Sequence, residues 1–309
     1  MASVAIHGSR PDLPAYLMLL AAAMLYGLVP SANLVVATAG VPGLTYAFWF
    51  SVIGACVALT ASVITRRRPG TTRQHFLAYL ATGVFGIALP FVFLTYAAPQ
   101  LPASIVVLLL ALTPGITYAL SVLIRLDVLR LSSVLGLALG LVGVVSLTWG
   151  GPDGYGGQLM WLGMVLLASL SFAISNLLAA VIRPPDAPSV SLAFGLLFAA
   201  TLVLFPFYLA GGGLYVPFLN GTGADWIIVG VGLLMAAFFF LFFETIQRAG
   251  PVFFSQFNYI SLLAGVVWAA LFFNEIPNTQ VAIAFMLIFL GVVLVNRGSG
   301  SVRPEEMPA

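Results

Sequence analysis

The side chains of this chain that could bind a solute are amides, hydroxyls and aromatic rings, and most of them lie inside long apolar runs. A polar group inside a lipid-spanning segment is costly, so it tends to face the interior of a helix bundle or an aqueous path. Such groups can hydrogen-bond the polar parts of a small solute while rings cover its apolar part. The predicted solute contacts are Tyr26, Asn33, Trp49, Tyr96, Thr117, Tyr118, Ser175, Asn176, Gln256, Asn258 and Tyr259.

Each of these residues also has a structural interpretation. Hydroxyls and amides in membrane helices often only bond a neighbouring helix or their own backbone, which is worth about 1 kcal/mol or less. We favour four residues as solute contacts. Asn33 and Asn176 are predicted at similar depth in two different runs, and Gln256 and Tyr259 stand three residues apart, on one face of a helix.

Glu244 is the only acidic residue well inside an apolar run. One interpretation is a carboxylate that couples transport to protons or binds a cation, because an intramembrane ionisable group is a functional hypothesis by default. The other is an ion pair with Arg248, one helical turn further on. The ion pair is favoured because Glu244 stands late in its run. Asp127 and Glu275 each close an apolar run and are predicted to have a helix-end or gating role.

Catalytic constellations are not found. The sequence contains no H-E-x-x-H, G-x-S-x-G or nucleotide-binding loop, and Cys56 is its single cysteine. We expect neither an enzyme nor a cofactor or metal site. The net charge of +2 is too small to indicate a nucleic-acid partner.

The composition is that of a membrane protein. Hydrophobic residues make up 61% of the chain, charged residues only 6%, and the mean hydropathy is +1.13. About 20 apolar residues cross a bilayer as a helix. On that basis the fold is predicted to be all-α, with ten membrane spans at about 14–38, 44–65, 76–97, 102–124, 131–149, 158–182, 189–211, 225–246, 251–273 and 279–296. Pro90 and Pro114 are predicted to kink two of these spans, and Gly250-Pro251 to separate two others.

The sequence repeats itself. Asp127 precedes an apolar run that contains Gly143-Val144-Val145, and Glu275 precedes one that contains Gly291-Val292-Val293 at the same spacing. With an odd number of spans between the copies, the two halves must be inverted relative to each other. The predicted organisation is an N-terminus (1–13), two inverted five-helix halves (14–149 and 158–296), a linker (150–157) and a tail (297–309).

The arginines agree with ten spans. The chain has no lysine, and all eleven arginines fall on one side of this assignment. Since cytoplasmic loops carry the excess of Lys and Arg, both termini are predicted to be cytoplasmic. A bacterial inner membrane is the expected location.

On these residues the chain resembles the EamA-like branch of the drug/metabolite transporter superfamily. The resemblance rests on the two halves, in each of which a helix with an acidic end precedes a Gly-Val-Val helix, and on Pro114 ahead of Asp127. The second half has Leu262 in the corresponding place. The resemblance implies a bundle in which spans one to four and six to nine enclose a cavity, while spans five and ten lie at the periphery.

Together these observations favour a secondary transporter for a small organic metabolite, with the lipid bilayer and its solute as the partners and a monomeric or homodimeric state. Movement by alternating access follows from the inverted halves. An amino-acid-type solute and the direction of export are implied by the resemblance alone. The alternatives are a lipid or lipid-linked-sugar translocase, toxic-cation efflux that uses Glu244, and a membrane scaffold without transport.

Overall fold

The computed structural model describes the fold of residues 12–125, 128–148, 156–184, 187–210, 215–219, 223–254, 257–274 and 279–299. Within these residues the secondary structure is helical and includes no strand, which confirms the all-α prediction. We call the described residues up to Thr148 the first half and those from Gly156 the second half. Asp127, Gln256 and Glu275, three of the predicted functional residues, lie outside the described ranges.

Seven helical stretches of the described chain are long and apolar enough to cross a membrane, namely Leu13–Thr38, Gly43–Ile64, Arg73–Ala97, Ile105–Leu123, Leu159–Ala179, Ser189–Ala210 and Asp225–Thr245. Three further apolar helices are shorter, Leu131–Ser146, Ile260–Phe273 and Ala282–Val295. All ten stretches fall inside predicted spans or within a few residues of them, because hydrophobic length is a strong signal.

Helices of the first half are interrupted. The first, third and fourth stretches each divide near their middle, whereas α3 (Gly43–Ile64) and α8 (Leu131–Thr148) are continuous. The divided stretches are α1 (Leu13–Gly27) with α2 (Val29–Thr38), α4 (Arg73–Gly83) with α5 (Leu89–Ala97), and α6 (Ala103–Leu110) with α7 (Thr113–Leu123). Between α4 and α5 the chain forms a turn of π-helix, η1 (Val84–Ala88).

A proline accounts for each interruption. Proline has no N–H to donate to the carbonyl four residues earlier, and its ring crowds that carbonyl. Pro30 follows the division between α1 and α2, Pro90 follows η1, and Pro114 follows the division between α6 and α7. The helices are thus interrupted beside Pro90 and Pro114, the two prolines predicted to kink spans, and beside Pro30 as a third.

Helices of the second half are continuous in the described residues. They are α9 (Leu159–Ile182), α10 (Ser189–Ala210), α11 (Asp225–Phe254), α12 (Phe257–Phe273) and α13 (Thr279–Ser299). The prediction that Gly250-Pro251 separates two spans is wrong, because α11 continues through both residues to Phe254. Pro206 also lies inside a helix, α10, without dividing it. A proline in a membrane helix is tolerated where neighbouring groups satisfy the freed carbonyl.

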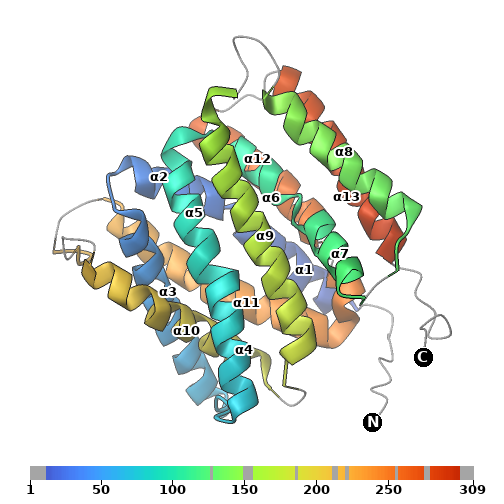
Figure 1. The fold of residues 1–309 in the computed structure, drawn as a ribbon. Coiled ribbons are helices and arrows are strands. Elements are labelled where there is room, and N and C mark those ends of the chain that lie inside the picture. Colours follow the sequence, from blue (N-terminus) through green and yellow to red (C-terminus); the bar gives the residue numbers. More distant parts are fainter. Residues whose placement is uncertain are drawn as a thin grey trace.

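The two halves interleave. α3 packs on α10 and α11, α10 also packs on α4, α1 packs on α11 and α12, and α9 packs on α5 and α7 (Figure 1). If the helices of the first half are matched in order with those of the second, each pairing has a counterpart. For example, α1 with α11 corresponds to α9 with α5, and α3 with α11 corresponds to α10 with α4. This pattern is that of two halves related by a pseudo-twofold axis.

α8 and α13 form a separate pair along one side of the bundle (Figure 1). They cross at glycines: a Cβ built on Gly136 would stand 2.5 Å from the carbonyl oxygen of Gly291, and one built on Gly291 would stand 2.5 Å from the carbonyl oxygen of Gly136. Small residues allow such close backbone approach in membrane helices. The Gly136-x-x-x-Gly140 pattern therefore serves packing within the bundle.

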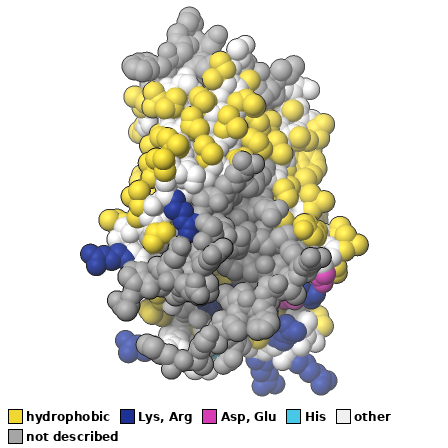
Figure 2. Space-filling model, turned by 90° about the vertical axis from the view of Figure 1, so that its right-hand side faces the viewer, with side chains coloured by type: hydrophobic (Ala, Val, Ile, Leu, Met, Phe, Trp, Pro, Cys, Tyr) yellow, Lys and Arg dark blue, Asp and Glu magenta, His cyan; other side chains and the backbone are white. Residues whose placement is uncertain are grey.

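The surface is apolar along most of its height. Leu77, Leu135, Leu202 and Phe207 are among many large hydrophobic side chains that are more than 45% exposed. Figure 2 shows hydrophobic side chains over the upper part of one face and arginines toward its lower end. We call this lower end the arginine end. There the first turn of α10 contacts the α3–α4 link, since the Ser191 hydroxyl donates to the Arg67 carbonyl oxygen at 2.8 Å.

Candidate functional site

The three interruptions of the first half all lie against helices of the second half. At the α1–α2 division the indole N–H of Trp268, from α12, donates to the Met24 carbonyl at 3.1 Å. At the α6–α7 division the Ser169 hydroxyl, from α9, donates to the Leu109 carbonyl at 3.1 Å. At η1 a Cβ on Gly86 would stand 2.7 Å from Ser175 Oγ, also from α9. Two backbone carbonyls at these interruptions thus accept hydrogen bonds from side chains across the bundle.

Aromatic rings gather beside two of these interruptions, the α1–α2 division and η1. The Tyr26 ring, directly before the α1–α2 division, lies 4.7 Å from the Phe238 ring, 5.5 Å from Phe257 and 6.3 Å from Phe172, centroid to centroid. Phe172 lies 6.3 Å from Phe91, the residue after Pro90. We call these five residues the ring cluster. It joins α1, α5, α9, α11 and α12, so it stands where both halves meet.

The ring cluster continues toward α3 and ends at a buried amide. Phe91 lies 4.7 Å from Phe50, and Phe50 lies 5.1 Å from Tyr46. The Tyr46 hydroxyl donates to Asn33 Oδ1 at 2.9 Å, and Asn33 is only 1% exposed. The Nδ2 group of Asn33 has no hydrogen-bond partner. A buried amide donor without a partner costs about 1–3 kcal/mol, so this group is available to an acceptor that reaches it.

The described part of the ring cluster carries no charged side chain. Glu244 stands further along α11, where its Oε1 accepts from Arg248 Nε at 2.9 Å. The ion pair, which was one of the two interpretations of Glu244, is therefore formed. The second oxygen, Oε2, is buried without a partner.

Arg183 packs against Phe243, the residue before Glu244. Its guanidinium lies 5.5 Å from the centroid of the Phe243 ring, a cation–π contact. Burial lowers the pKa of this guanidinium from its usual value. The arginine end of α11 thus carries the Glu244–Arg248 ion pair and, at the neighbouring Phe243, a cation–π contact.

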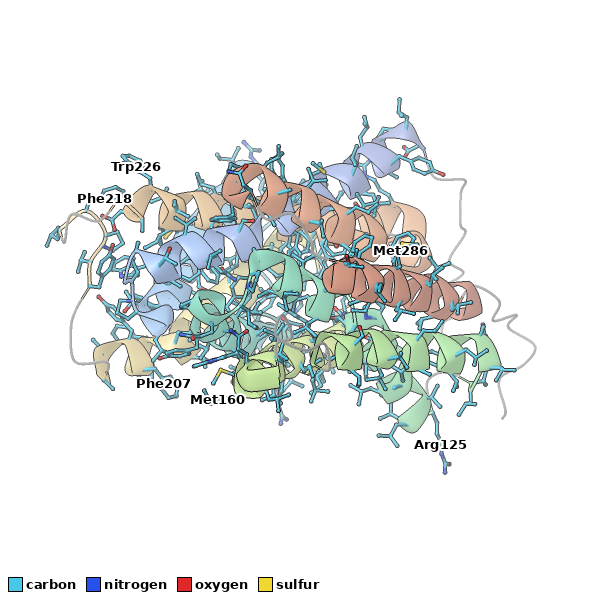
Figure 3. All side chains as sticks on the ribbon, turned by 90° about the horizontal axis from the view of Figure 1, so that it is seen from above. Arg125, Met160, Phe207, Phe218, Trp226 and Met286 are labelled. Carbon is cyan, nitrogen blue, oxygen red and sulfur yellow. The ribbon has the colours of Figure 1, made fainter. Side chains whose placement is uncertain are left out.

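Trp49 and Tyr118, two predicted solute contacts, bind the backbone of links between helices. The Trp49 indole N–H donates to the Tyr215 carbonyl at 2.9 Å, which also accepts from the Tyr208 hydroxyl at 3.0 Å. The same link is held by Asp225, 2% exposed, which accepts from the Tyr215 hydroxyl and, at 3.0 Å, from the Phe218 N–H. Figure 3 shows Phe218 beside Trp226 at this edge, away from Arg125.

The Tyr118 hydroxyl donates to the Val128 carbonyl at 2.9 Å and accepts from the Arg130 N–H at 2.7 Å, across the α7–α8 link. Thr117 donates to the Thr113 carbonyl one turn earlier in its own helix, at 2.8 Å. These bonds are of the structural kind that membrane helices use. A solute contact by either residue would add to these bonds or replace them.

The remaining predicted contacts are spread over different surroundings. Tyr26 is half-buried in the ring cluster, and Ser175 is buried against η1. Asn176 is exposed and Tyr96 is 45% exposed, so Asn33 and Asn176 differ in burial despite their matching positions in the sequence. Asn258 and Tyr259 lie in α12, but their side chains are outside the described part.

Sequence reasoning missed the phenylalanines of the ring cluster. Phe91, Phe172, Phe238 and Phe257 look like ordinary apolar residues among the 24 phenylalanines of the chain. A usable signal was the position of Phe91 directly after Pro90, at a predicted kink. Phe238 and Phe239 are buried while Phe240 is 39% exposed, so the Phe238–Phe243 run is a packing surface on one side and a lipid-facing surface on the other.

Comparison with known proteins identifies the family. The EamA-like transporter family model matches the chain twice, over residues 13–149 and 159–297. The chain therefore belongs to the EamA-like transporter family, as its resemblance implied, and is a membrane transporter of the drug/metabolite superfamily. No curated protein matches it. A crystal structure of another protein matches with a TM-score of 0.63 at 19% identity, over 93% of this chain and 99% of the other, a likeness of fold alone.

Proposed function

We propose that the protein is a secondary transporter that moves a small organic solute by alternating access. In this proposal all ten apolar stretches cross the membrane, the two halves are inverted, and the arginine end faces the cytoplasm of a bacterial cell. The pairing of helices across a pseudo-twofold axis supports the inversion. The excess of arginine at one end supports the orientation.

The observation that carries the proposal is the meeting of two interrupted helices, α1–α2 and α4–α5, at the ring cluster between the halves. Secondary transporters place solute sites near the middle of the bilayer, at discontinuous helices between two repeats. Here the interruptions at Pro30, Pro90 and Pro114 fall near the middle of their stretches, and each contacts a second-half helix. The solute is proposed to bind there, between the halves.

The proposed solute is net-neutral, with an apolar or aromatic body. Five rings offer stacking surface, whereas Glu244 is already neutralised by Arg248. Amino acids with large apolar side chains fit this chemistry, and their export follows the expectation from the family. With Tyr46 on its oxygen, the amide of Asn33 retains Nδ2 as a donor for a solute carboxylate.

Counterflow of radiolabelled solutes in proteoliposomes tests the proposal. The panel contains aromatic, aliphatic and charged amino acids, sugars and nucleosides. We expect exchange of aromatic or large aliphatic amino acids and none of charged ones. Folded protein that exchanges no member of the panel would remove the amino-acid proposal. Scrambling of labelled lipid or efflux of organic cations by the same vesicles would instead favour one of the alternatives.

A pair of variants on one helix locates the site. Phe238→Leu alters the ring cluster, whereas Phe240→Leu alters a neighbouring exposed ring of α11. An aromatic contact is worth about 0.5–1.5 kcal/mol, so Phe238→Leu should weaken solute exchange about two- to tenfold. Phe240→Leu should leave exchange unchanged. Equal effects of the two variants would place the site elsewhere.

A further inference from the structure

α3 ends at the arginine end in an unusual cap. The Arg66 N–H donates to the Val63 carbonyl at 3.1 Å and the Arg67 N–H to the Ser62 carbonyl at 3.0 Å, the bonds that commonly close a helix on a left-handed residue. That residue is ordinarily glycine. Here it is Arg66, with a φ of 56°. A non-glycine residue in this region costs about 1 kcal/mol or more, so the surrounding structure must hold it.

Two buried hydroxyls hold the cap. The Ser62 and Ser191 hydroxyls both donate to the Arg67 carbonyl oxygen, the latter at 2.8 Å. Ser62 and Ser191 are 0% exposed. Ser191 belongs to α10, so the second half of the molecule fixes the end of a first-half helix. The backbone that carries Arg66 and Arg68 is therefore ordered by the fold.

The cap borders a cleft with two kinds of lining. Arg66, Arg68 and Val63 line a space of about 550 Å³. Val63 and Ile64, in the last turn of α3, are 65% and 76% exposed. The ion pair between Glu244 and Arg248, which is the one formed among the described residues, does not involve Arg66 or Arg68. Two guanidinium groups thus stand beside an apolar surface at the boundary of a membrane helix.

We propose that this cleft binds the phosphate of an anionic lipid headgroup, with Val63 and Ile64 against the upper part of its acyl chains. Guanidinium groups bind phosphate oxygens through paired N–H donors. Basic pockets beside membrane helices on the cytoplasmic side bind acidic lipid headgroups. The combination of phosphate-binding and apolar groups favours a lipid over a soluble anion. This lipid site is separate from the ring cluster and does not depend on transport.

Native mass spectrometry of the full-length protein in detergent tests this site. Phosphatidylglycerol is compared with phosphatidylcholine of the same chains, and inorganic phosphate is a competitor. We expect phosphatidylglycerol to bind about tenfold more tightly or better. Arg66→Gln with Arg68→Gln should abolish this preference. Arg125→Gln with Arg130→Gln removes the same charge from the α7–α8 link and should retain it.

Ser191→Ala tests whether lipid binding needs the ordered cap or only the charge of the arginines. It keeps every arginine but removes one hydroxyl that donates to the Arg67 carbonyl. It should weaken phosphatidylglycerol binding about two- to fivefold, an effect of the size expected for one hydrogen bond. The proposal fails if both arginine pairs lower the preference equally or if Ser191→Ala has no effect. Displacement of the lipid by millimolar inorganic phosphate would overturn the lipid assignment in favour of a soluble anion. Each variant is first checked for a wild-type melting temperature.

Discussion

The helices of the two halves of this transporter follow the same order, but they differ in whether they are interrupted. In the first half, prolines divide three of five helical stretches near their middle, whereas the second-half helices are continuous in the described residues. At two of the divisions a backbone carbonyl accepts from a side chain of the second half, Trp268 or Ser169. The repeat thus preserves the order of the helices, while the proline interruptions are concentrated in the first half and helices of the second half pack against them.

The α8–α13 pair shows the opposite behaviour, because here the halves remain alike. Both helices contain the repeated Gly-Val-Val. The offset of 148 residues that relates Asp127 to Glu275 also matches Gly143 with Gly291 and Gly136 with Ala284. Gly136 faces Gly291, and Gly143 faces the Ala284 carbonyl, at 3.2 Å from a built Cβ. These two contacts are equivalent across the pseudo-twofold axis. The repeated motif therefore serves pairing of the halves.

The test of the inverted halves has the largest expected effect, because two reporters emerge either in opposite compartments or in the same one. Reporter fusions placed after Ile124, at the end of α7, and after Asn274, just past α12, should emerge in opposite compartments. Compartment-specific activity of the fused reporters measures this. If both reporters emerge in the same compartment, the halves are parallel and do not form an inverted repeat.

Replacing Pro90 with alanine restores an N–H that can bond the Gly86 carbonyl and straighten η1. Since an interior proline costs about 3 kcal/mol in a helix, Pro90→Ala should keep or raise stability while slowing solute exchange about tenfold. Pro206→Ala, in the continuous α10, is the matched control and should leave exchange unchanged. Counterflow and melting temperature are measured together. Loss of exchange in both variants would show that the interruptions have no special role.

Gly136→Ala tests the part of the molecule where the halves are alike. The added methyl would stand 2.5 Å from the Gly291 carbonyl oxygen, so α8 and α13 must separate. Overpacking of this kind costs about 1–3 kcal/mol, which should lower the melting temperature. Gly230→Ala, in α11, meets no atom within 4 Å and should have no such effect. Equal melting temperatures for both variants would contradict the close crossing.

The smallest expected effects concern the hydrogen bonds from the continuous second-half helices to the divided helices. Trp268→Phe removes the donor to Met24, and Ser169→Ala removes the donor to Leu109. Each change should cost about 1 kcal/mol or less of stability. Trp226→Phe is the control for the indole, because Trp226 is 73% exposed. Thermal unfolding in detergent distinguishes these variants, and a control that melts as low as Trp268→Phe would argue against a stabilising role of these hydrogen bonds.

The sequence by itself determined the fold class, the positions of the apolar helices and the kinks at Pro90 and Pro114. These features depend on hydrophobic length and on the missing N–H of proline, which are local properties of the chain. The sequence also determined the pairing of Glu244 with Arg248, because residues four apart on a helix are neighbours. The helix end predicted at Gly250-Pro251 was wrong, because a proline in a membrane helix can either interrupt the helix or be tolerated inside it.

Only the tertiary structure decided which side chains meet. Tyr26, Phe91, Phe172 and Phe238 are far apart in the sequence, and no local pattern distinguishes them from other aromatic residues of the chain. Trp49 and Tyr118 stay predicted solute contacts, but only the packing shows that their polar atoms also donate to backbone carbonyls of links between helices. In a bundle where nearly every helix is apolar all round, sequence periodicity does not identify the inward face, and only the packing of helices against one another does.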